Sequence, residues 1–153
     1  MRRVPWRLMP LFALLACQTL GFGPARIPEC PVRLVSTTAM DAFRLRYHVV
    51  VEGARPDAVA AYFDLVAESR ASVLTLVAWN RFGAQLFAVR QRGMHVERVG
   101  PVLPGFPASP ERILADFQRL HFLGAAVTAP DGTRVVDACG TRTRFARVSE
   151  DPP

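Results

Sequence analysis

The sequence predicts an α+β domain that is mainly β: a curved antiparallel sheet, or incomplete half-barrel, with one amphipathic helix packed on its concave face. Three observations lead to this prediction. Segments in which apolar and polar residues alternate are joined by short turns, one segment with helical periodicity follows a proline-rich stretch, and two short segments close the chain. Alternation with a period of two indicates half-buried strands, and short turns between them indicate antiparallel pairing.

The first strand is expected at residues 43–51, where Phe43, Leu45 and Tyr47 share one face and charged residues share the other. Residues 59–69 alternate in the same way after a short turn. Both segments are therefore expected to bury one face only.

Three more strands complete the expected meander, at residues 72–79, 84–90 and 94–99. The first of these is apolar at nearly every position, which predicts a strand covered on both sides. Two closing strands are expected at residues 134–138 and 141–148, around a glycine.

The expected helix begins near Ser109, after a segment whose three prolines disfavour a strand. Ser109 can cap the helix and a proline suits the first helical position. Apolar residues at helical spacing form one stripe, so Arg112, Asp116 and Arg119 are expected to face away from it. Gly124 indicates the end of the helix.

The apolar side of this arrangement has two interpretations. A plain core between sheet and helix is the simpler one. A cavity would suit an amphiphile or acyl-chain ligand, because ligand sites are concave and mostly apolar. The residues expected to line such a cavity are Phe43, Leu45, Phe63, Leu65, Ile113, Leu114, Phe117 and Leu120.

The N-terminal segment has the features of a bacterial lipoprotein signal peptide, expected at residues 1–16. Three arginines precede an apolar run that is too short to span a bilayer, and the run ends in LLAC at Cys17. This pattern matches a lipobox, so Cys17 is expected to become the lipidated N-terminus; the alternative is an ordinary signal peptide with a chance cysteine. Residues 17–41, rich in proline and glycine, are expected to form an extended tether to a domain at residues 42–149.

The residue after the lipidated cysteine predicts whether the lipoprotein is in the inner or the outer membrane. Position 18 is Gln18 rather than the aspartate that usually retains lipoproteins in the inner membrane of enteric bacteria. The expected location is therefore the periplasmic face of the outer membrane, with the lipid bilayer as a partner through the lipidated N-terminus.

The two remaining cysteines are Cys30 and Cys139. In an oxidising compartment an even number of cysteines favours a disulfide, although two independent thiols are the alternative. The chain contains no CxxC pair, so the cysteines do not suggest a thioredoxin-like redox function.

Charge and motifs exclude several classes of function. The net charge of +6 falls to +3 once the three signal arginines are removed, and the remaining arginines are scattered, so no nucleic-acid partner is expected. His48, His95 and His121 are expected on different elements, without metal-ligand spacing, and as surface residues. No nucleophile or phosphate-loop motif is present, so we expect a monomeric binding protein that has no cofactor or metal and is not an enzyme.

Residues 76–122 resemble the central part of a family of Gram-negative lipoproteins of unknown function, often encoded among aryl-polyene synthesis genes. The shared features are an xxGxxLF strand after a turn, an LP before the helix, and a P-E-x-[IL]-L-x-D-[FL]-Q helix at residues 110–118. That family is similar in turn to the Lol-type carrier and receptor of lipoproteins, whose helix-covered half-barrel holds acyl chains.

The resemblance implies an outer-membrane lipoprotein that binds or transfers a lipid-like ligand, such as an acyl or polyene lipid or a lipoprotein. The alternative is an anchored structural or interaction module with a filled core and no ligand. The Lol receptor presents an apolar residue in a loop between central strands, and Phe82 lies in a comparable turn. The chain ends soon after Val148, where relatives continue into further strands, so the half-barrel is expected to be incomplete.

We predict that the mature protein begins at an acylated Cys17. Mass spectrometry of the N-terminal peptide from the native membrane fraction is expected to show a diacylglyceryl and an amide-linked acyl group on this residue. A Cys17→Ala variant is expected to keep its signal segment. A mature chain that starts at any other residue would contradict the prediction.

Overall fold

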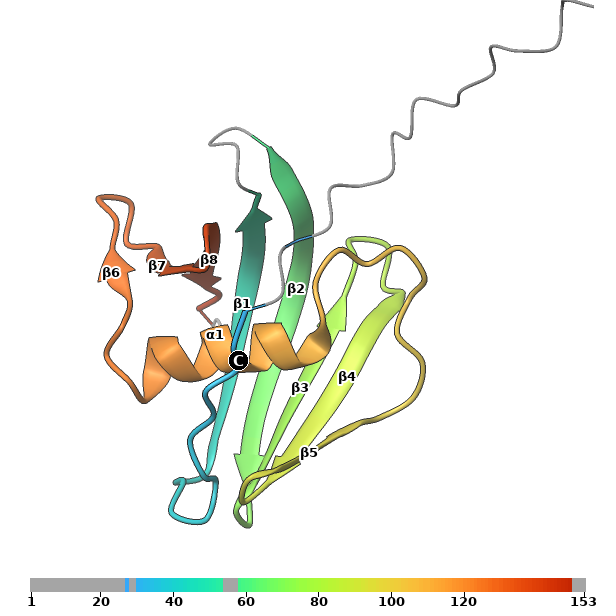
Figure 1. Cartoon of the computed structure of the whole chain (residues 1–153), viewed down its shortest axis with the longest axis vertical. Helices are drawn as coiled ribbons and strands as arrows, with labels where there is room; N and C mark the ends of the chain where they lie inside the picture. The colour runs from blue at the N-terminus through green and yellow to red at the C-terminus, as the bar shows by residue number, and fades with distance from the viewer. Residues whose placement is uncertain (1–26, 28–29, 54–57, 150–153) are drawn as a thin grey trace, which may run out of the picture.

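The computed structural model describes residues 27, 30–53 and 58–149, which form one eight-stranded antiparallel sheet and one helix (Figure 1). Along the sheet the strand order is β5-β4-β3-β2-β1-β8-β7-β6. The predicted mainly β fold, with an open antiparallel sheet and a packed helix, is confirmed. The strands are β1 (Phe43–Glu52), β2 (Val59–Arg70), β3 (Val73–Trp79), β4 (Gln85–Arg92), β5 (His95–Arg98), β6 (Val127–Thr128), β7 (Arg134–Ala138) and β8 (Thr141–Arg147).

Helix α1 (Pro110–His121) lies across one face of the sheet (Figure 1). It contacts both β4 and β7, which lie near opposite edges of the sheet. Ser109 caps its N-terminus by accepting a hydrogen bond from the Arg112 N–H at 3.2 Å, as the sequence predicted. The helix ends three residues before Gly124, whose φ of +62° accompanies a hydrogen bond from the Ala125 N–H to the Arg119 carbonyl.

The face of the sheet under the helix forms the core. Alternate residues of β1 and β2 are buried there, as the period-two pattern predicted. The outer face remains open to water over most of its area, and the expectation that β3 is covered on both sides is wrong. Val77 and Trp79 on the outer face of β3 are partly exposed, because the only helix among the described residues lies on the other side.

Two tight turns use residues in the left-handed region. Ala71 and Ser72 join β2 to β3 with φ of 49° and 61°, so Ser72 lies in a turn rather than in the strand expected at 72–79. Cys139 and Gly140 join β7 to β8 with φ of 50° and 73°. Two-residue turns with positive φ match the twist of antiparallel strands.

Strand β6 is the element that the sequence did not predict. It has only two residues, Val127 and Thr128, which pair with Val135 and Arg134 of β7. A segment this short carries no alternation that periodicity could detect.

Residues 30–40 form an extended strap that lies against the folded domain. The buried Gln118 of α1 accepts a hydrogen bond from the Val35 N–H at 2.7 Å, and buried Gln91 of β4 donates to the Val35 carbonyl at 2.8 Å. Gln118 also donates to Gln91 at 2.6 Å. The tether expected over residues 17–41 therefore does not include this stretch, because two glutamines on the core side bind its backbone.

Thr37 holds the far end of the strap. Its hydroxyl donates to the Ser72 carbonyl at 2.6 Å and accepts from the Gly93 N–H at 2.8 Å. The side chain is fully buried. The strap thereby caps two turns of the sheet, β2–β3 and β4–β5.

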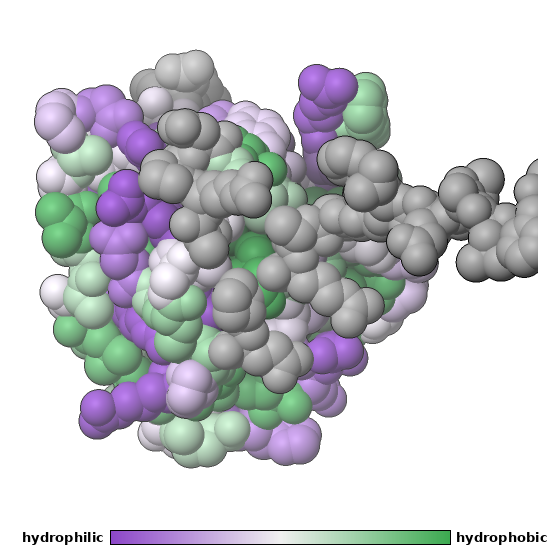
Figure 2. Space-filling view, turned by 45° about the horizontal axis from the view of Figure 1, so that its top comes forward, coloured by the Kyte–Doolittle hydropathy of each residue, from purple (hydrophilic) through white to green (hydrophobic). Residues whose placement is uncertain are grey.

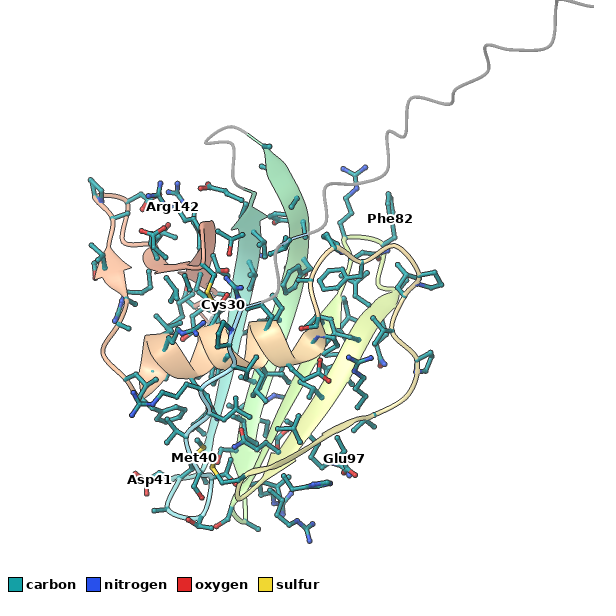
Figure 3. All side chains as sticks on the ribbon, in the orientation of Figure 1. Cys30, Met40, Asp41, Phe82, Glu97 and Arg142 are labelled. Carbon is teal, nitrogen blue, oxygen red and sulfur yellow. A yellow bond between two sulfur atoms is a disulfide. The ribbon has the colours of Figure 1, made fainter. Side chains whose placement is uncertain are left out.

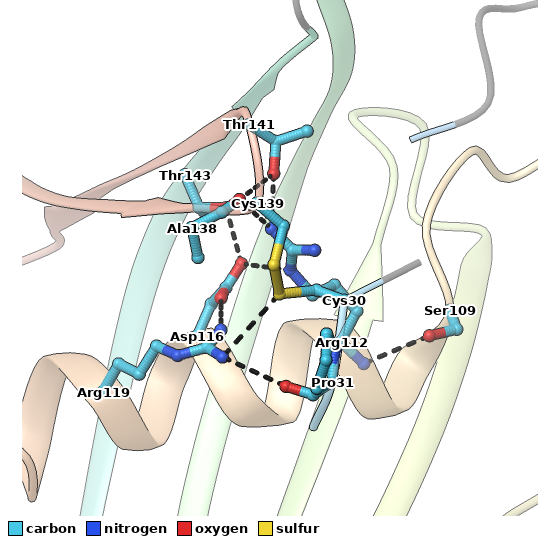
Figure 4. Close-up of polar contacts among 10 residues, drawn as sticks. All are labelled: Cys30, Pro31, Ser109, Arg112, Asp116, Arg119, Ala138, Cys139, Thr141 and Thr143. Atoms are coloured by element: carbon cyan, nitrogen blue, oxygen red, sulfur yellow. Dashed lines mark hydrogen bonds and ion pairs between the residues drawn. A yellow bond between two sulfur atoms is a disulfide. The ribbon is translucent and has the colours of Figure 1, made fainter. Parts of the chain in front are cut away.

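A buried ionic network joins α1 to the β7–β8 hairpin (Figure 4). Asp116, 1% exposed, accepts hydrogen bonds from Arg112 at 3.2 Å, Arg119 at 2.6 Å and Thr143 at 2.8 Å. Arg112, 4% exposed, also donates to the Ala138 carbonyl at 2.7 Å and to the Thr141 hydroxyl. The expectation that these charged residues face away from the core is wrong for Arg112 and Asp116, because the hairpin covers that side of the helix.

A disulfide joins the strap to this hairpin. Cys30 and Cys139 are bonded across 109 residues of sequence, with their Cα atoms 5.7 Å apart. Arg119 donates to the Pro31 carbonyl at 3.4 Å beside the disulfide (Figure 4). Strap, helix and hairpin are thus held together at one place by a covalent bond and by charge.

The face of the molecule drawn in Figure 2 carries both polar and apolar residues. Among the described residues, no helix is long and apolar enough to cross a membrane.

We predict that Asp116→Asn lowers the free energy of unfolding by about 3–5 kcal/mol, because it removes the carboxylate that pairs with the buried Arg112 and the partly buried Arg119. Glu111→Gln is the control, since its partner Arg98 is 53% exposed and exposed pairs contribute about 0–1 kcal/mol. Urea denaturation followed by circular dichroism measures both. Equal, small losses in the two variants would show that the Asp116 network does not stabilise the fold.

Candidate functional site

The eight residues expected to line a cavity meet between the sheet and the helix, and most of them fill that space. Five of them have no exposed surface, Leu120 is 4% exposed, and Phe43 and Leu45 are partly exposed. The five without exposed surface are Phe63, Leu65, Ile113, Leu114 and Phe117.

Aromatic contacts show how closely this face is packed. The Phe63 ring lies 5.5 Å from Phe106 and 6.0 Å from Phe87, centroid to centroid. Phe117 lies 6.2 Å from Phe43 and 6.4 Å from Tyr47. These side chains pack as a core, so the plain-core interpretation describes the centre of the concave face.

The packing opens toward the first residues of β1. Strand β8 pairs with β1 only from Tyr47 onward, and the Val148 N–H bonds to the Arg46 carbonyl. Phe43 and Leu45, whose side chains face inward, precede the part of β1 that pairs with β8. The Phe43 ring is 6.3 Å from that of Phe122, which is 38% exposed at the end of α1.

A surface hollow lies beside this open end of β1. It is bordered by Leu45 and three arginines and by the segment that follows β8. Its lining residues are Arg44, Leu45, Arg46, Arg147, Val148 and Ser149.

Tyr47 and His121 form a polar pair above Phe43. The Tyr47 hydroxyl and His121 Nε2 are 2.8 Å apart. The imidazole ring also packs 4.5 Å from the Phe117 ring and 6.4 Å from Phe43, so aromatic side chains surround the hydrogen-bonded edge. His121 is an exposed residue, as expected, and its Nε2 in addition contacts the buried Tyr47.

Burial and two arginines shift the titration of this pair. Burial first, and then the positive charges of Arg134 and Arg147, together lower the pKa of His121 to about 4. Burial raises the pKa of Tyr47 above its usual value, while the same two arginines oppose that rise. At neutral pH the imidazole is therefore uncharged and the phenol keeps its proton.

Arg134 and Arg147 occupy inward positions on their strands. Arg147 is paired directly with the buried Tyr47, and Arg134 is paired with the buried Phe145 two residues before Arg147. Within the described part of the chain neither arginine makes an ion pair, and the Nε of Arg134 is buried without a hydrogen-bond partner. Diagonal positions of a hairpin are within reach of long side chains, so two like charges there repel each other.

The other residues considered from sequence lie elsewhere. His48 is on the outer face, with Nδ1 2.5 Å from the Asp64 carboxylate, and His95 is at the start of β5. Within the described ranges no group of three or more His, Cys, Asp or Glu could hold a metal ion. Cys17 lies outside the described residues.

Phe82 projects from the β3–β4 turn, at the opposite end of the sheet from Met40 and Asp41 (Figure 3). Its side chain is 80% exposed and the Arg81 guanidinium lies 4.7 Å from the ring centroid. Phe82 is therefore far from the residues around Phe43.

Sequence reasoning did not identify Tyr47, Arg134 or Arg147 as site residues. They come, with His121, from β1, β7, β8 and α1, and no spacing in the chain connects them. The available signal was an arginine at the inward position of an alternating strand, as in RVVDA of β7.

The fold and site define a small disulfide-bonded protein of the mainly β class, with one open sheet and one helix. A family comparison confirms the coarser expectation, a family of unknown function. The chain belongs to the family described as a protein of unknown function (DUF3261), whose model matches residues 48–150. No curated protein and no solved structure matches the chain.

We predict that Phe117→Ala lowers the free energy of unfolding by about 3–5 kcal/mol, because the ring has no exposed surface and its removal leaves a cavity. Phe82→Ala, which truncates an 80% exposed ring, is expected to change it by less than about 0.5 kcal/mol. Thermal or urea unfolding gives both values. A cost near zero for Phe117→Ala would indicate that α1 is a loosely packed lid.

Proposed function

We propose that the protein is a lipid-anchored lipoprotein of the periplasmic face of the outer membrane, and that it binds the apolar part of a lipid-like ligand at the open end of the concave face. The ligand site is the surface around Phe43, Leu45 and Phe122. Cys17 supplies the anchor.

One observation carries this placement. Phe43 and Leu45 are inward-facing apolar residues that remain partly exposed, whereas the other inward positions of β1 from Tyr47 onward are buried. The reason is that β8 ends at Arg147, so that among the described residues no strand pairs with the first residues of β1 on that side. An acyl chain laid against this surface removes apolar area from water.

The resemblance to the Lol-type carrier and receptor supports a lipid-like ligand, and the filled centre of the concave face favours the open end of β1 over a central cavity as its site. In this chain α1 packs directly on the sheet, and its middle is tied to the β7–β8 hairpin through Asp116. A ligand that binds at the open end of β1 does not have to displace that part of the helix.

Phe82 supports the proposed membrane location. An exposed aromatic ring beside an arginine suits the interface between water and lipid head groups, where apolar and charged groups are both accommodated. Phe82 lies at the other end of the sheet from the proposed ligand surface, so both sites are available at once.

The filled centre of the concave face favours a second candidate function. Phe63, Ile113 and Phe117 have no exposed surface, as in an anchored interaction module that holds no ligand. Both candidates are binding functions, and we propose no catalysis. Among the described residues the hydrogen bonds of the two histidine pairs, Tyr47–His121 and His48–Asp64, include no serine or cysteine nucleophile.

We predict saturable binding of a dansyl-labelled undecanoic acid to the chain from Gln18 onward, and its displacement by unlabelled decanoic acid. Phe43→Ser is expected to weaken binding at least tenfold, because it removes the central apolar contact. Tyr62→Ser is the control, since Tyr62 is 52% exposed on the outer face of β2.

Circular dichroism and unfolding curves establish that both variants keep the fold. No saturable binding to the intact folded protein would favour the interaction module instead. Equal loss in the two variants would place the ligand elsewhere.

A further inference from the structure

We propose that Tyr47, His121, Arg134 and Arg147 form a binding site for a phosphate group at the C-terminal end of α1. The four side chains come from β1, α1, β7 and β8, and all lie on the helix side of the sheet. The site borders the open end of β1.

The register brings the four residues together. Arg147 of β8 pairs directly with Tyr47 of β1. Arg134 of β7 pairs with Phe145, which lies two residues before Arg147 on β8 and on the same face of the sheet. The Tyr47 hydroxyl is 2.8 Å from His121 Nε2. In accord with this register, the positive charges of both arginines act to lower the pKa values of Tyr47 and His121.

The charge of the site calls for an anion. Arginine forks match phosphate geometry, and two of them here have no carboxylate partner among the described residues. By contrast, Arg112 and Arg119 of the neighbouring network share Asp116. His121 is neutral and Tyr47 protonated at neutral pH, so the pair can supply hydrogen bonds without adding charge.

The Arg134 side chain offers a hydrogen-bond donor that no described residue accepts. The Nε of Arg134 is buried and has no hydrogen-bond partner, although buried polar groups in folded proteins nearly always have one. An oxyanion between Arg134 and Arg147 accepts this hydrogen bond and removes the repulsion between the two cations. We choose phosphate over carboxylate because two cations and further donors suit a group with more than two acceptor oxygens.

Arg134 and Arg147 could instead serve to stabilise the C-terminal end of α1, and this explanation must be distinguished from phosphate binding. Cations near the C-terminus of a helix complement its dipole. In α1, however, the Gln118 and Arg119 carbonyls already accept from the N–H groups of Phe122, Leu123 and Ala125. A dipole role also leaves the Arg134 Nε without a partner.

The adjoining apolar surface extends the inference to the source of the phosphate. Phe43, Leu45 and Phe122 border the site, so a phosphate that carries an alkyl chain gains contacts that inorganic phosphate lacks. This step rests on the proposed function, whereas the phosphate site itself does not.

The test uses the full chain purified in a neutral maltoside detergent, with inorganic phosphate and decyl phosphate as the two probes. Isothermal titration gives the affinities, and the Arg134 Nε–H signal in a nitrogen-15 NMR spectrum reports contact with the anion. We expect saturable binding of both probes and a shift of this signal. Decyl phosphate is expected to bind at least tenfold more tightly than inorganic phosphate.

Matched variants separate a site from a general effect of charge. Arg134→Gln and Arg147→Gln are expected to weaken both probes at least tenfold. Arg142→Gln, which removes a cation from the outer face of the same strand β8, is expected to change neither by more than twofold. Unfolding curves show that each variant retains the fold.

The outcomes distinguish this proposal from the proposed function. Inorganic phosphate that binds as expected, with no gain for decyl phosphate, leaves the phosphate site standing and contradicts the amphiphile. Decyl phosphate that binds equally well to Arg134→Gln and Arg147→Gln leaves the amphiphile standing and overturns the phosphate site. Absence of phosphate binding, or equal loss in Arg142→Gln, also overturns it.

The chain's own carboxylates provide a last control. Glu150 and Asp151 follow Arg147 closely in sequence and lie outside the described residues. In the double variant Glu150→Gln, Asp151→Asn, phosphate is expected to bind as tightly as before or more tightly. Loss of phosphate binding in this variant would contradict a site that is built from the two arginines.

Discussion

The buried carboxylate of Asp116 is the interaction on which the arrangement of this protein depends. It lies in the middle of the only helix among the described residues and binds Arg112, Arg119 and Thr143. Removing a charge from water is costly unless its partners compensate, so the helix is stable in one orientation, with Asp116 against the β7–β8 hairpin. The Cys30–Cys139 disulfide fixes the strap to the same place.

This constraint bears on where the proposed ligand would bind. With its polar side held by the hairpin, α1 presents Ile113, Leu114 and Phe117 to the sheet and fills the centre of the concave face. The C-terminal end of the helix lies beyond the Asp116 network. Beside Phe43 and Leu45, which lie near this end, β1 no longer pairs with β8. Apolar surface, a tyrosine–histidine pair and two arginines that form no ion pair with any described residue therefore meet at an end of this face that the core leaves partly open.

Much of the fold could be predicted because local pattern and tertiary burial agree in it. The alternation in β1 and β2 and the Ser109 cap of α1 reflect which side of each element meets the core. The failures occur where burial comes from distant segments. Arg112 and Asp116 have the spacing of a solvated helix face, and only the hairpin that covers them makes them part of the interior.

The sequence by itself determined the strand and helix periodicity, the caps and turns, and the motifs on which the lipoprotein proposal rests, because these depend on residues near one another in the chain. Only the tertiary structure decided that residues 30–40 form a strap, that Cys30 meets Cys139, and that Tyr47, His121, Arg134 and Arg147 share a site. The physical reason is that each of these depends on the register of strands and the seating of the helix. Both are set by the packing of the whole core rather than by any single segment.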